Sequence, residues 1–187
     1  MGFVQRRMPA LLVVLVGAAG VVAWIAVSRV LAGPTCTDTW TAGASGSWTT
    51  AANWTNNSSL HAVPGTSDDV CINQAGTYTV TLSAGVSVNE FTVGGASSGT
   101  QTLVLSSAAS ASLGISAPSA VAAGGVLVIG DTGNGNTTVA GSTLSNDGTI
   151  TTVAGSGGAR FLRTNVTNNA DGTVNVFSGG TQSDGSG

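Results

Sequence analysis

Residues 76–82 read Gly-Thr-Tyr-Thr-Val-Thr-Leu, and this pattern of a glycine followed by alternating β-forming residues returns four more times along the chain. The later copies begin at Gly99, Gly125, Gly148 and Gly172, so the steps between glycines are 23, 26, 23 and 24 residues. A period of this length is typical of stacked repeat architectures. We therefore predict an all-β, right-handed parallel β-helix with about 24 residues per coil over residues 76–177.

Each coil is expected to hold two or three short strands with corners of Gly, Ser or Asn. Alternate side chains of a strand point to opposite faces, so aliphatic residues at every second position indicate the inward face. The predicted strands cover residues 77–82, 88–93, 100–105, 126–129, 149–153 and 173–177. The predicted inward residues are Val80, Leu82, Leu103, Leu105, Val126, Val128, Ile150, Val174 and Val176.

A β-sandwich or jelly roll is the alternative within the all-β class, because many short strands also fit those folds. The near-constant step favours the β-helix. So does the repetition of Asp147-Gly148-Thr149-Ile150 as Asp-Gly-Thr-Val at 171–174, one period later.

The composition supports sheets and restricts the partners. Only 7% of the 187 residues are charged, and Val, Ile and Thr are frequent, which favours strands over helices or disorder. After residue 33 the chain holds two arginines, no lysine and all eight acidic residues, a formal charge of −6. A nucleic-acid partner is disfavoured, because phosphate binding needs a basic surface.

The first 32 residues form a separate targeting segment. Arg6 and Arg7 precede an uncharged, mostly aliphatic run over residues 8–28, and small residues place a signal-peptidase site between Ala32 and Gly33. The run also matches the roughly 20 residues that span a bilayer as a helix, so a retained membrane anchor is the alternative. Both alternatives place the rest of the chain outside the cytoplasm, secreted or on the cell surface.

Two cysteines, Cys36 and Cys71, lie in the exported part of the chain. An even number of cysteines in an oxidising compartment predicts one disulfide, and two reduced thiols are the alternative. A zinc site is not expected, because His61 is the only histidine and two thiolates do not complete a tetrahedral shell.

Residues 33–75 form a Trp-rich capping module that contains Trp40, Trp48 and Trp54. The end of a solenoid exposes an apolar cross-section and unpaired strand edges, which large aromatic side chains can cover. The alternative is a platform on which the three indole rings stack against a sugar, and this makes them candidate ligand-binding residues.

The order of the tryptophans, with Asn53-Trp54, then Pro64 and Asp68-Asp69-Val70, resembles the opening of bacterial surface β-helix proteins. These include autotransporter-type passengers and pectin-lyase-like repeat proteins. The resemblance covers residues 34–72 and extends to the later repeats by pattern alone. It implies a cap that precedes glycine-rich coils on a surface protein. The translocator barrel of autotransporters is not in this sequence.

Groups for catalysis are scarce, and no cofactor is expected. Asp147 and Asp171 lie one period apart, and carboxylates on successive coils are weak candidates for a calcium site or an acid–base pair. Asp before Gly at a corner is also ordinary turn chemistry. Arg160 and Arg163 are interpreted as a solvated corner or as partners of these aspartates, with an anionic ligand as the alternative.

These observations predict an exported structural or adhesive β-solenoid without catalysis, which contacts an extracellular glycan or a surface protein. The alternatives are a carbohydrate-binding module built on the Trp cluster and the remnant of a polysaccharide-active β-helix enzyme. The polar tail, residues 178–187, contains no aliphatic or aromatic residue and is not expected to cover the last coil, as in a truncated repeat protein.

Overall fold

The computed structural model describes residues 35–177. The predicted hydrophobic helix over 8–28, the cleavage site between Ala32 and Gly33 and the polar tail lie outside the described residues. Within the described range the only helices are two 3-10 turns, η1 (Ala51–Asn53) and η2 (Ser107–Ala109), and neither has the length or the hydropathy of a membrane-crossing helix.

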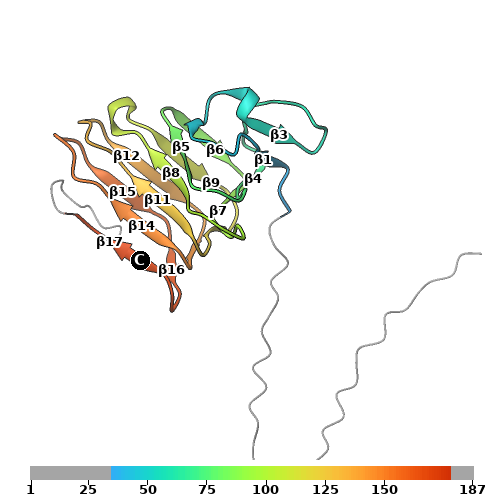
Figure 1. Cartoon of the computed structure of the whole chain (residues 1–187). Helices are drawn as coiled ribbons and strands as arrows, with labels where there is room; N and C mark the ends of the chain where they lie inside the picture. Colours follow the sequence, from blue (N-terminus) through green and yellow to red (C-terminus); the bar gives the residue numbers. More distant parts are fainter. Residues whose placement is uncertain (1–34, 178–187) are drawn as a thin grey trace, which may run out of the picture. The chain divides into compact units, whose positions relative to one another are not determined.

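The chain folds into a parallel β-solenoid of about four turns, in which each complete coil gives one strand to each of three sheets (Figure 1). The all-β fold class and the coil length of about 24 residues are therefore confirmed. The right hand of the coil stays a prediction. Sheet A contains β1 (Asp38–Trp40), β3 (Trp54–Asn56), β4 (Asp69–Ile72), β7 (Glu90–Val93), β10 (Ser119–Val121), β13 (Leu144–Asn146) and β16 (Val166–Asn168). Sheet B contains β2 (Gly46–Ser47), β5 (Tyr78–Leu82), β8 (Gln101–Leu105), β11 (Gly125–Ile129), β14 (Thr149–Thr152) and β17 (Thr173–Asn175). Sheet C contains β6 (Gly85–Val88), β9 (Ser112–Ile115), β12 (Thr137–Gly141) and β15 (Arg160–Arg163).

Sheet B keeps the most regular register. The inward column runs through Val80, Leu103, Leu127, Ile150 and Val174, with steps of 23, 24, 23 and 24 residues. Gly125 pairs with Gln101 and not with Gly99, so the third glycine of the repeat lies two residues out of line with the second. The step of 26 seen in the sequence therefore reflects the glycine and not the coil.

The predicted inward residues Val126 and Val128 are wrong by one position. Leu127 and Ile129 are fully buried, and the two valines lie on the outer face of sheet B. The run Val-Leu-Val-Ile is apolar on both faces, so its own alternation carries no phase, and pairing with β8 and β14 decides which face is inward.

Two other predictions are corrected. The predicted strand over 88–93 is two strands, β6 and β7, because the chain turns a corner at Asn89. Val174 and Val176, predicted to be buried, are 42% and 50% exposed. Val174 does pair with Ile150 in the inward column, but no described strand pairs beyond β17.

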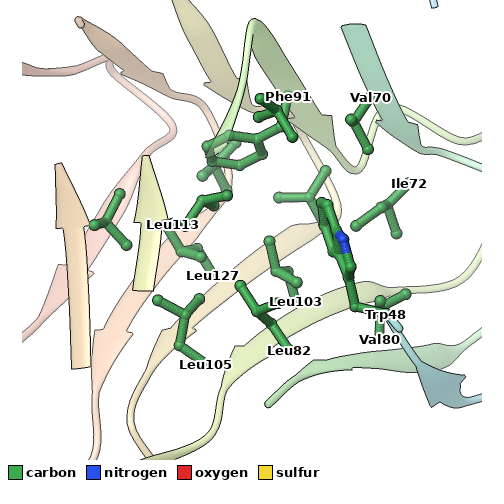
Figure 2. Close-up of a cluster of buried hydrophobic side chains, with 14 of the residues drawn as sticks. Trp48, Val70, Ile72, Val80, Leu82, Phe91, Leu103, Leu105, Leu113 and Leu127 are labelled. Atoms are coloured by element: carbon green, nitrogen blue, oxygen red, sulfur yellow. The ribbon is translucent and has the colours of Figure 1, made fainter. Parts of the chain in front are cut away.

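The core is a single column of aliphatic side chains that ends in aromatic ones. Figure 2 shows the Trp48 indole beside Ile72 and Val80, with Leu82, Leu103 and Leu105 following in the next coils. All of these side chains are fully buried. Because each coil covers the side chains of its neighbour, the apolar interior is continuous along the solenoid.

The capping module starts as an incomplete coil. β1 pairs in parallel with β4, and β2 pairs in parallel with β5, so both strands continue the sheets of the solenoid. The chain then returns through η1, and β3 pairs with β1 in the antiparallel direction. This reversed strand ends sheet A at its N-terminal edge.

Candidate functional site

The three tryptophans of the capping module are packed against one another and away from solvent. Trp54 lies between the other two, with ring centroids 5.0 Å from Trp40 and 4.7 Å from Trp48, both in edge-to-face geometry. Its Nε1 donates a hydrogen bond to the Trp48 carbonyl oxygen at 2.7 Å. All three side chains are 0% exposed, so no ring face is open to a stacking sugar. The sugar-platform alternative is therefore wrong for these rings, and their burial supports the capping interpretation.

The predicted disulfide between Cys36 and Cys71 is present, with the two Cα atoms 5.6 Å apart. It joins the residues before β1 to β4, the first strand of the first complete coil. In the chain-entropy model, closing a loop of this size stabilises the fold by about 3–4 kcal/mol. The cap is thus held to the solenoid by strand pairing, by aromatic packing and by a covalent bond.

The weak calcium candidates serve as corner residues. The Asp147 carboxylate accepts a hydrogen bond from Asn169 Nδ2 at 2.9 Å, and Asp171 is exposed. Within residues 35–177 no three side chains of the His, Cys, Asp or Glu type gather in one place. The contact of Asp147 supports its turn interpretation, and a calcium role for Asp171 stays a prediction.

A third aspartate, Asp131, is the most strongly perturbed acid of the described chain. Its carboxylate accepts hydrogen bonds from Ser106 Oγ at 2.8 Å, from the backbone N–H of Ser107 at 3.1 Å and of Gly133 at 2.8 Å, and also from Ser107 Oγ. Burial alone would raise the pKa of Asp131, but these hydrogen bonds outweigh it and lower the pKa to about 2. Asp131 therefore stays ionised and holds two neighbouring coils together at the corner between sheets B and C.

Arg160 completes this corner and corrects its predicted role. The side chain is only 8% exposed, and it pairs with neither Asp147 nor Asp171. Its guanidinium group donates five hydrogen bonds to backbone carbonyl oxygens, those of Asp131, Gly133, Gly135, Val153 and Gly157, at 2.9–3.2 Å. We call Asp131 and Arg160, with the groups they bind, the corner clamp. Because its donors are already used, Arg160 is not available to an anionic ligand.

The second arginine lies apart from the corner clamp. Arg163 is exposed, and its guanidinium carbon lies 4.2 Å from the centroid of the Phe161 ring. A cation over an aromatic face at an exposed site stabilises by about 0.5–1 kcal/mol. Arg163 is thus the described arginine that fits the prediction of a solvated side chain.

The outer face of sheet B is the surface that the predictions missed. Its five long strands contain no charged residue. The outward side chains form two rows that follow the stack of coils, with successive side chains about 4.8 Å apart along each row. One row contains Thr79, Thr102, Val126, Thr149 and Thr173, and the other contains Thr81, Val104, Val128, Thr151 and Asn175.

Nine of the ten residues in these rows are β-branched, and such side chains have few rotamers. A surface that is ordered before binding loses little conformational entropy when a partner contacts it. The sequence showed the threonines, but the wrong phase of β11 placed Val126 and Val128 inside. The correct register would have revealed the rows.

Comparison of the chain with protein-family models, with curated proteins and with solved structures finds no significant match. The likeness to β-helix surface proteins is therefore supported at the level of the parallel β-helix fold.

Proposed function

We propose that this protein is an exported structural or adhesive β-solenoid of the bacterial surface type, and that it contacts an uncharged extracellular glycan through the outer face of sheet B. The observation that carries this proposal is the pair of regular, charge-free Thr and Val rows on that face. Sugars present hydroxyl groups beside C–H groups, and alternating threonine hydroxyls and valine methyl groups complement both. A surface protein is the second partner that such a face would accept.

The disulfide supports an extracellular location. Such bonds persist in oxidising compartments and are rare in the cytosol. Cys36–Cys71 lies directly after the predicted targeting segment, at the base of the fold. Secretion or display at the cell surface follows, with residues 8–28 as the membrane anchor if that segment is retained.

A non-catalytic role agrees with the state of the charged groups. An acid–base mechanism needs a group that exchanges a proton near neutral pH and faces the substrate. Asp131 is held ionised by its donors, and Arg160 is bound to backbone carbonyls. These two residues hold coils together, as a scaffold requires.

The test is a glycan array probed with the full-length protein and with two charge variants. Thr102→Glu and Thr149→Glu each place a carboxylate in the first row of sheet B, while Thr138→Glu places one on the outer face of sheet C as a matched control. We expect the sheet B variants to lose at least about tenfold in affinity, equivalent to 1.4 kcal/mol, with an unchanged Tm. Absence of binding to every glycan, or an equal loss in the control, would reject the proposed surface.

A further inference from the structure

A polar cavity of about 220 Å³ lies beside the capping module, between the first strands and the loop that leads to β4. Asp38 of β1 and Asn56 of β3 line one side of it, and the other lining residues come from the flanking residues and the loop. The complete lining is Thr37, Asp38, Asn56, Asn57, Ser58, Ala62 and Asp68. Six of these seven side chains contain an oxygen atom.

Asp38 is a buried carboxylate that lacks adequate donors. It is 3% exposed, and its one hydrogen bond comes from the hydroxyl group of Thr37 at 3.5 Å, the outer limit for such a bond. The same hydroxyl lies 3.4 Å from the carbonyl oxygen of Asp69, so its proton is shared. Removing a carboxylate from water without hydrogen bonds or a counter-charge is strongly unfavourable. The Asp38 side chain therefore requires a partner in the cavity.

A second carboxylate faces the same cavity. Asp68 accepts a hydrogen bond on Oδ2 from the Gly65 N–H at 2.7 Å, and no bond to its Oδ1 is found within residues 35–177. Burial, and next the charge of Asp68, raise the pKa of Asp38. The two described arginines lie in the fourth coil, one in the corner clamp and the other over Phe161. No protein cation therefore neutralises this pair.

We propose that the cavity binds a calcium ion, coordinated by the carboxylates of Asp38 and Asp68 and completed by water. Ca²⁺ takes six to eight oxygen ligands in flexible arrangements, whereas Mg²⁺ demands an octahedron and loses water reluctantly. Asn57 and Ser58 supply further neutral oxygen atoms. Asn56 does not, because its Oδ1 already accepts two backbone N–H bonds.

The site has the charge of a weak, extracellular calcium site. Two carboxylates and neutral oxygens correspond to extracellular modules, whose Kd values are about 10⁻⁴–10⁻³ M. The cavity also leaves room for several waters, each of which occupies roughly 30 Å³. Bound calcium would tie the loop before β4 to β1, and so would fasten the capping module a second time next to the disulfide.

The experiment is a calcium titration of the oxidised full-length protein, followed by calorimetry and by thermal unfolding. At tenfold excess over Kd we expect the Tm to rise by about 3–5 °C. Asp38→Asn and Asp68→Asn should abolish both the heat and the Tm shift. Asp171→Asn, which removes an exposed aspartate far along the sequence, should keep both.

Three outcomes would overturn the site. One is the absence of heat and of a Tm shift at about 10 mM calcium, ten times the weakest expected Kd. Another is an undiminished response in Asp38→Asn. The third is an equal shift with magnesium, or with sodium at the same ionic strength, which would show general screening and not coordination. An Asp38→Asn protein that is more stable without metal, beside a wild type that ignores calcium, would identify a protonated Asp38 instead.

Discussion

The two ends of the solenoid are built in opposite ways (Figure 1). At the N-terminal end, Trp40, Trp48 and Trp54 are fully buried, and β3 reverses direction to end sheet A. At the other end of the described chain, Phe177 is 60% exposed. The inward column of sheet B shows the difference most directly, because Ile150 is 1% exposed and its partner Val174 is 42% exposed. An inward position is therefore buried by the next coil and not by its own strand.

The stabilising contacts differ as well as the burial. The N-terminal end is held by aromatic packing and a disulfide, which depend little on charge. The later coils rely on the corner clamp, in which Arg160 of the fourth coil binds carbonyls of the third. Stability in repeat proteins is carried by neighbouring interfaces, so damage to one end should be felt most by the coils next to it.

The largest effect should come from breaking the aromatic cap. Trp54→Ala removes the ring that contacts both other tryptophans, and we expect it to cost about 3–5 kcal/mol of unfolding free energy. Phe177→Ala, at the exposed end, should cost about 0.5 kcal/mol or less. Urea unfolding followed by circular dichroism measures both. If the two substitutions cost the same, the two ends do not differ in the way that their burial indicates.

A second test addresses the corner clamp. Arg160→Met keeps the aliphatic stem but leaves five carbonyl oxygens without their donor, and we expect a loss of about 3 kcal/mol. Arg163→Met is the matched control, because that exposed arginine makes only a stacking contact with Phe161 and should cost about 1 kcal/mol or less.

Thermal and urea unfolding of these two variants decide the point. Hydrogen exchange adds the location of the damage. Loss of protection in β12 and β15, with β4 and β5 unchanged, would show that the clamp acts locally. A uniform loss along all coils would contradict the independence of the two ends.

Much of this contrast could be predicted from the sequence. The glycine period revealed the coils, and the position of the tryptophans before the first repeat revealed the cap. Both signals are local in the chain. The disulfide followed from the number of cysteines and the predicted compartment.

The remaining features depend on register, which the sequence does not carry at every strand. The phase of β11 is set by its neighbours, so Val126 and Val128 were assigned to the wrong face and the rows of sheet B were hidden. Arg160 was expected in solvent, since nothing near it in sequence shows that carbonyls of the preceding coil surround its guanidinium group. Asp38 looked like any polar residue until β3 and the loop after it enclosed the cavity.

The smallest effect separates the two ends by pH. The pKa of Asp131 falls from 3.8 to about 2 on folding, so its carboxylate contributes stability that is fully present above pH 4 and is lost as the pH falls toward 2. Full linkage over such a shift would be about 2.5 kcal/mol, and partial exposure of the residue reduces our expectation to about 1 kcal/mol. The unfolding free energy of wild type minus that of Asp131→Asn, measured from pH 7 to pH 2, should therefore shrink below pH 4.

Ser107→Ala removes one of the donors that lower this pKa, so the pH at which the difference disappears should rise in that background. The cost of Trp54→Ala should stay constant over the same range, because no titrating group contributes to its ring contacts. Acid would then loosen the coils joined by the clamp before it affects the cap. A difference between wild type and Asp131→Asn that does not change with pH would show that Asp131 is no more strongly ionised in the folded protein than in the unfolded chain, and the later coils would lose their distinctive sensitivity to charge.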